Sequence, residues 1–166
     1  MIEVSVDGSE EMLSALDRLS RELSNPRSLM QEIGEGLLAS TKARFKDSVG
    51  PDGSAWIPKS AATMDAYRAR GDTVSFRPLR GPSGRLAGEI AYTIGINGRF
   101  VEIGSNQIYA GVMQHGARRG AFGQSDNGSP IPWGDIPARP FLGLSAKDED
   151  FIMFAIDEWL KEATSG

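Results

Sequence analysis

The sequence has 166 residues, 40% of them hydrophobic, with a formal net charge of −4 and no cysteine. This length and apolar content predict a single domain, residues 1–166. The net charge argues against a dedicated nucleic-acid binder. The missing cysteines exclude disulfides and thiolate metal sites. There is no signal-peptide pattern and no apolar run near the roughly 20 residues that span a bilayer, so we expect a protein made in the cytoplasm, with no membrane contact.

The first elements that the chain predicts are a strand and a helix. Ile2, Val4 and Val6 alternate with polar residues, which is the pattern of a half-buried strand. Asp7 or Ser9 can then cap a helix. The apolar face of this helix follows helical spacing and comprises Met12, Leu16, Leu19 and Leu23.

A second and longer helix is predicted to end near Lys46. Asn25 supplies an N-cap and Pro26 suits the first helical position. Gly34 and Gly36 each cost about 1 kcal/mol relative to alanine inside a helix. They therefore indicate either a weakened helix or the close approach of another backbone.

The next stretch of the chain predicts a loop, a short helix and an excursion without regular structure. Residues 48–60 carry strong turn signals, and Trp56 is expected to pin this loop to the core. Ser60 can cap a helix that runs through Arg70. Residues 71–84 show no periodicity, which predicts a mobile excursion or a segment that is ordered only by a partner.

A hairpin is the clearest predicted element. Alternating apolar residues over 89–96 and 99–104 flank Asn97-Gly98, which is a strong hairpin signal. A short helix is predicted over residues 107–115. The glycine-rich segment 117–135 then predicts a second flexible excursion.

The last part of the chain predicts an extended strand and a helix. Pro137 and Pro140 stiffen residues 137–144, which present Arg139. Ser145 and Asp148 form a capping box for the final helix. With four strand candidates that do not alternate with helices, the fold class is α+β, with a small, mainly antiparallel sheet of about four strands, the hairpin at its centre and long helices on one face.

Few residue types here support catalysis. The sequence has one histidine and lacks metal-ligand spacings, phosphate loops and nucleophile elbows, so we expect no catalytic residues, no metal and no cofactor. His115 suits a helix-capping, pH-sensitive or interface role better than that of a hydrolase base. Arg139 suits either an ordinary exposed position or a bidentate ion pair within the protein or between subunits.

Charge and aromatic residues point to assembly instead. The net charge is −4 over residues 1–24, +5 over 59–119 and −4 over 143–166, so the ends of one copy can face the middle of the next. Trp133 suits an interface anchor. The candidate assembly interface comprises Trp133, Arg139, Phe141, Arg118, Arg119 and His115, and the candidate basic patch comprises Arg77, Arg80 and Arg85.

Several motifs occur in an order that resembles the phage virion-morphogenesis (tail-completion) family of Mu-like bacteriophages and prophages. They are Phe45, Pro51-Asp-Gly53 with Trp56 and Pro58, Thr63, Ser83-Gly-Arg-Leu86, Val101-Glu-Ile-Gly104, Tyr109-Ala110 with Gln114-His115-Gly116, and Ile136-Pro-Ala-Arg-Pro-Phe-Leu-Gly143.

The resemblance implies a non-enzymatic virion protein of the tail or neck that completes the tail or joins it to the head. Its partners would be further copies in a ring, together with tail-tube or head–tail connector proteins. The alternative is an adaptor module of the neck whose basic residues 59–119 contact nucleic acid weakly.

Overall fold

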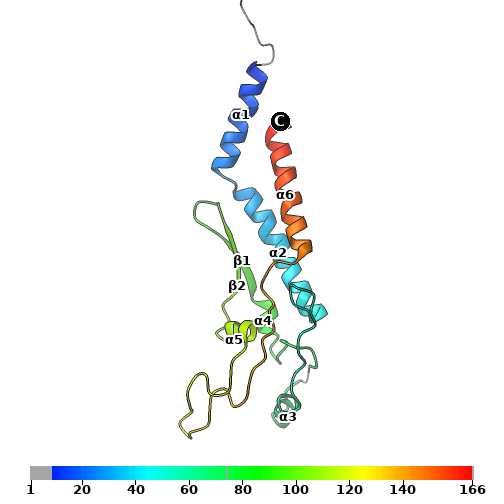
Figure 1. Ribbon diagram of the computed structural model, residues 1–166, viewed down its shortest axis with the longest axis vertical. Coiled ribbons are helices and arrows are strands. Elements are labelled where there is room, and N and C mark those ends of the chain that lie inside the picture. Colours follow the sequence, from blue (N-terminus) through cyan, green and yellow to red (C-terminus); the bar gives the residue numbers. More distant parts are fainter. Residues whose placement is uncertain (1–8, 74, 166) are drawn as a thin grey trace, which may run out of the picture.

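The computed structural model describes residues 9–73 and 75–165, which form six helices and one two-stranded antiparallel sheet. Three helices define the long axis of the molecule (Figure 1). α1 (Ser9–Ser24) leads into α2 (Arg27–Asp47), and α6 (Ala146–Ser165) runs back alongside α2 until it contacts α1. None of the described helices is long and apolar enough to cross a membrane.

The hairpin lies against α2. β1 (Ile90–Ile94) pairs with β2 (Val101–Ser105), with Tyr92 opposite Ile103. α2 therefore lies between the sheet and α6, and its apolar stripe contributes Leu29, Ile33 and Leu37 to one core cluster. The predicted hairpin is confirmed, although its return strand begins at residue 101 because residues 95–100 form the turn.

The two glycines of α2 each admit an aromatic ring. A Cβ atom on Gly34 would lie 2.5 Å from the ring of Tyr92 in β1, and one on Gly36 would lie 2.2 Å from the ring of Phe151 in α6. The glycines therefore let neighbouring elements approach the helix closely, as one of the two predicted explanations has it. The groups that approach are aromatic side chains, however, and not another backbone.

A second core cluster lies at the other end of α2. Phe45, Trp56 and Phe141 form its aromatic centre, with ring centroids 5.3–5.4 Å apart. Leu79 and Leu86 close it from the segment before the hairpin. Small helices surround this end: α3 (Ala61–Ala69), α4 (Arg85–Gly88) and α5 (Ala110–His115).

Two predicted caps are confirmed and one is wrong. The Ser60 hydroxyl accepts from the Thr63 amide at 3.2 Å, and the Asp148 carboxylate accepts from the Ser145 amide at 2.8 Å, so α3 and α6 begin as expected. Pro26, rather than Asn25, occupies the N-cap of α2, and it offers no side-chain cap.

The prediction of about four strands is not confirmed. The strand predicted over residues 2–6 lies outside the described residues, and residues 137–144 form no ladder. Side chains of Arg44, Trp56 and Gln114 bind the backbone groups of this extended segment instead.

The first predicted excursion, residues 71–84, is held to the core. Apart from Val74, which the structure does not describe, it contains the buried residues Pro78 and Leu79. The Lys59 ammonium donates to the carbonyl oxygens of Ser75 and Arg80, both at 2.6 Å. The protein therefore orders this segment without a partner.

Candidate functional site

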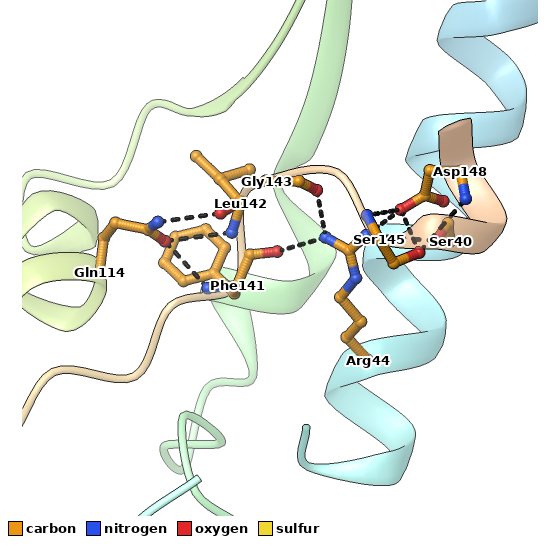
Figure 2. A network of polar contacts seen from close by, with 8 residues as sticks. All are labelled: Ser40, Arg44, Gln114, Phe141, Leu142, Gly143, Ser145 and Asp148. Carbon is orange, nitrogen blue, oxygen red and sulfur yellow. Dashed lines mark hydrogen bonds and ion pairs between the residues drawn. The ribbon is translucent and has the colours of Figure 1, made fainter. Parts of the chain in front are cut away.

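The proline-flanked signature forms an internal anchor. We call residues 137–145 the anchor segment. The side-chain amide of Gln114 pairs with it as a neighbouring strand would: its oxygen accepts from the Phe141 and Leu142 amides at 2.9 and 3.1 Å, and its nitrogen donates to the Leu142 carbonyl at 3.0 Å (Figure 2). The Trp56 indole donates to the Pro140 carbonyl at 2.8 Å.

Arg44 in α2 binds the anchor segment from the opposite side. It donates to the carbonyls of Phe141 and Gly143 at 3.1 and 2.7 Å and forms an ion pair with Asp148, at the start of α6 (Figure 2). Both charged groups are buried. Burial raises the pKa of Asp148, but the hydroxyls of Ser40 and Ser145 and the charge of Arg44 outweigh it and hold this pKa below its usual value.

Arg139 lies inside the protein rather than at the exposed position predicted for it, and the predicted ion pair between subunits stays a prediction. Its side chain is 7% exposed and donates to the carbonyls of Ile57 at 2.6 Å and Pro58 at 3.0 Å. It therefore is not an ordinary surface residue, and it forms no ion pair with another described residue. Burial lowers the pKa of this guanidinium. The hydrogen bonds of Arg139 hold residues 56–58 against the anchor segment.

A glycine allows two parts of the signature to meet. Gly116 has φ +75°, and a Cβ atom there would lie 2.6 Å from the Ile136 carbonyl oxygen and 2.8 Å from the Ala138 nitrogen. Only glycine suits this contact. The sequence 114–116 and the sequence 136–143 are therefore two sides of one packed junction.

The predicted interface residues separate into two groups. Phe141 is fully buried, and Arg139, which is 7% exposed, lies at the wall of a cavity rather than on the outer surface. Trp133, Arg118, Arg119 and His115 are exposed, and Trp133 is 77% exposed. The assembly interface remains a prediction, and of its six residues only this second group lies on the outer surface.

Trp133 lies on a protruding element that we call the ribbon, residues 117–135. Ala117 and Ile136 exchange backbone hydrogen bonds of 2.9 and 2.7 Å at its base. Further bonds link Phe122 to Ile131 and Ser125 to Ser129, both at 2.8 Å. The second predicted excursion is therefore a hydrogen-bonded ribbon, and it presents the exposed apolar side chains Phe122, Ile131 and Trp133.

A cavity of about 660 Å³ lies beside the base of the ribbon. Leu79, Tyr109 and Met113 contribute to its apolar walls. Its cations are Lys59, Arg85 and Arg139. Burial lowers the pKa of Lys59, and the nearby charge of Arg139 acts in the same direction.

The predicted basic patch lies near this cavity. Arg77, Arg80 and Arg85 are all exposed, and Arg85 lines the cavity directly. Among the described residues no group of three or more histidine, aspartate or glutamate side chains is placed to hold a metal ion.

Arg44 and Gln114 hold the anchor segment in place, but neither role was predicted from the sequence. Arg44 follows Leu37 and Thr41 at helical spacing on the buried stripe of α2, and a charged residue on such a stripe is a weak signal for a buried ion pair. Gln114 carries no such signal, because its partners lie 27 and 28 residues away.

The model of the phage virion morphogenesis family matches residues 7–161. The chain is 27% identical over 161 residues to the Mu-like prophage FluMu G protein 2 of Haemophilus influenzae, covering 97% of each chain. It is 32% identical over 145 residues to the putative capsid assembly protein G of Escherichia phage Mu, covering 86% of this chain and 83% of that protein. No solved structure matches.

Proposed function

This chain belongs to the phage virion morphogenesis family and so has a structural or assembly role in the phage particle; we propose that it completes the tail or joins the tail to the head, as an oligomeric ring. Its place is then the tail or neck of the virion. Its partners are further copies of itself and the tail-tube or head–tail connector proteins. The role needs no bond-breaking step.

The observation that carries this proposal is the division between the buried signature and the exposed ribbon. Arg139, Phe141 and Gln114 build a rigid junction inside the protein. The ribbon leaves that junction and presents Trp133 and Phe122 to the outside. Tryptophan is enriched among the residues that contribute most to binding at protein interfaces, so an exposed tryptophan on a hydrogen-bonded, protruding element is typical of an interface anchor.

The name of the phage Mu relative adds a second argument. That protein is described as a putative capsid assembly protein, whereas the resemblance in the sequence points to the tail. A position at the joint between head and tail accommodates both, because a protein there contacts head and tail components.

The test is a deletion of this gene in a phage or prophage that carries it, complemented with variants. We expect the deletion to yield heads and tails that do not form infective particles. Trp133→Ala should remain folded but lower the titre by roughly tenfold or more, since a tryptophan anchor contributes about 2 kcal/mol or more.

The matched control is Ile96→Ala, which alters a fully exposed apolar side chain at the turn of the hairpin, away from the ribbon. It should complement fully. Normal infective virions from the deletion strain would contradict the proposed function. Full complementation by Trp133→Ala would contradict the role of the ribbon.

The alternative function, contact with nucleic acid in the neck, rests on the exposed arginines Arg77, Arg80 and Arg85. Few phosphate contacts predict weak binding that depends only moderately on salt. A gel-shift titration at low and moderate salt distinguishes the two functions. Binding at low salt that weakens at moderate salt and that Arg77→Ala/Arg80→Ala abolishes would favour the adaptor module, and no binding at either salt concentration would exclude it.

A further inference from the structure

α1 exposes an apolar face that the other described residues, 25–73 and 75–165, do not cover. Met12, Leu13, Leu16 and Leu23 are each more than half exposed. α6 packs along one edge of this face, where Ala15 and Leu19 are half-buried, and leaves the rest of the face exposed. A contiguous exposed apolar face on a soluble domain typically marks an interaction surface.

Acidic residues surround this face. Glu10, Glu11, Asp17 and Glu22 of α1 are exposed, and the adjacent end of α6 contributes Asp157, Glu158 and Glu162. Three basic residues, Arg18, Arg21 and Lys161, offset these charges only in part. A partner that fits this end of the molecule is therefore apolar at its centre and basic at its rim.

The cavity at the opposite end of the molecule has those properties. Its walls include Leu79, Tyr109 and Met113, and its cations are Lys59, Arg85 and Arg139. One carboxylate, Asp135, also lines it and accepts from the Arg119 amide at 2.8 Å. The exposed Arg80, whose carbonyl binds Lys59, lies beside it, whereas Arg70, which stacks on the cavity residue Tyr67, is paired with Asp72 at 2.9 Å.

The cations of the cavity have no carboxylate partner among the described residues. Lys59 donates to two backbone carbonyls, and Arg139 donates to three. Neither forms an ion pair within the described part of the chain. Positive charge lining an apolar cavity favours an occupant with acidic residues beside apolar ones.

We propose that the exposed face of α1 in one copy docks at the cavity of the next copy. α1 lies at one end of the long axis, and α3 and the ribbon lie at the other, so the two surfaces cannot meet within a single chain (Figure 1). Such a contact is heterologous: each copy offers one surface of each kind, and the contacts continue until a ring closes. The inference rests on the proposed ring and names the surfaces that form it.

Mixing two variants tests the heterologous contact. Leu13→Gln/Leu16→Gln removes the apolar face, and Arg80→Glu/Arg85→Glu reverses the charge at the cavity. All four side chains are exposed, so we expect both proteins to fold with unchanged circular dichroism. In sedimentation velocity at rising concentration the wild type should form oligomers, and each variant alone should stay monomeric.

A mixture of the two variants should form dimers and no larger species, because each supplies one intact surface. Phe154→Gln, a matched change at an exposed apolar residue of α6, should associate as the wild type does. A wild type that stays monomeric, an α1 variant that still assembles, or a mixture that forms no dimer overturns the proposal. Growth beyond dimers in the mixture would indicate a different contact and also overturns it.

A charge swap tests which residues face one another. Glu10→Lys/Asp17→Lys should lower the association constant by about tenfold, since the new lysines meet the arginines of the cavity. Combining it with Arg80→Glu/Arg85→Glu in one chain should restore association. If the combined variant does not associate, α1 docks elsewhere. If the wild type binds an unrelated acidic peptide with equal affinity, the cavity does not select α1.

The complementation assay separates this inference from the proposed function. If the gene is required for virions while the α1 variant complements fully, only the assignment of the contact fails. If the gene is dispensable while the mixed variants form dimers, the contact stands and the proposed function fails.

Discussion

At the scale of single residues, the buried Arg44–Asp148 pair connects three parts of the chain. Arg44 belongs to α2, Asp148 caps α6, and both bind the anchor segment between them. A buried ion pair needs further hydrogen bonds to offset the loss of hydration. The carbonyls of Phe141 and Gly143 and the Ser145 amide and hydroxyl supply them.

Arg44→Ala should therefore lower the free energy of unfolding by about 3–5 kcal/mol, because it leaves the Asp148 carboxylate buried without its cation. Urea unfolding followed by tryptophan fluorescence measures the change. Lys161→Ala, which breaks an exposed pair with Glu158, is the control and should cause no measurable change. Equal effects of the two substitutions would contradict the structural role of Arg44.

The same pair predicts a dependence of stability on pH. Asp148 has a pKa below its ordinary value in the folded protein, so its stabilising effect is present above that ordinary value and is lost as the pH falls through the folded pKa. The stability difference between the wild type and Asp148→Asn should shrink from about pH 5 to about pH 3. A difference that stays constant over this range in urea titrations would argue against an ionised Asp148.

Arg139 and Arg118 both belong to the candidate interface, but we expect their substitution by alanine to affect the stability of the fold differently. Arg139→Ala should destabilise the fold by about 2 kcal/mol or more, since it leaves the carbonyls of Ile57 and Pro58 without their charged donor. Arg118→Ala, at an exposed position of the ribbon, should leave the melting temperature unchanged. Thermal unfolding of the two variants decides whether Arg139 serves the fold, and a stable Arg139→Ala protein would show that it does not.

At the scale of elements, α2 supports the sheet on one side and α6 on the other. Its glycines place an aromatic ring of each neighbour directly against the helix, at Gly34 and Gly36. Helix propensity alone predicts that alanine would stabilise these positions. The rings reverse that expectation, because a methyl group has no space there.

Gly34→Ala should lower the free energy of unfolding by about 1–3 kcal/mol, since Tyr92 must move to accept the new methyl group. Gly111→Ala in α5 is the matched control, because nothing lies within 4 Å of its added Cβ atom. It should be neutral or slightly stabilising. Chemical denaturation of both variants gives the comparison, and a stabilised Gly34→Ala protein would contradict the packing of Tyr92 on α2.

At the scale of the whole molecule, the chain has a helical end and a loop-rich end (Figure 1). The first carries α1 and the end of α6, and the second carries α3, the cavity and the ribbon. The two predicted excursions differ in their relation to this framework. Leu79 of residues 71–84 enters the core, whereas the ribbon meets the core only at its base.

Replacing residues 118–135 by Asn-Gly should therefore preserve the fold, because Ala117 and Ile136 already form the closing pair of a hairpin. We expect the free energy of unfolding to change by less than about 1 kcal/mol, while complementation in the phage is lost. Leu79→Ala should instead cost about 2–5 kcal/mol. Unfolding of the shortened protein would show that the ribbon belongs to the core.

The sequence by itself determined the elements whose signals are local. The long helices, the hairpin and the caps of α3 and α6 follow from periodicity and short-range hydrogen bonding over a few residues, and the structure confirms them. The ordered motifs also sufficed for the family, which the comparison with known proteins supports over residues 7–161.

Only the tertiary structure decided the size of the sheet, the burial of Arg139 and the existence of the cavity. The anchor segment has the extended backbone of a strand, yet Gln114, Trp56 and Arg44 bind its polar groups from 27, 84 and 97 residues away. Contacts at such separations leave no period in the sequence. Whether the anchor segment pairs with another strand or is bound by side chains therefore depends on how α2, α5 and loop 48–60 pack together.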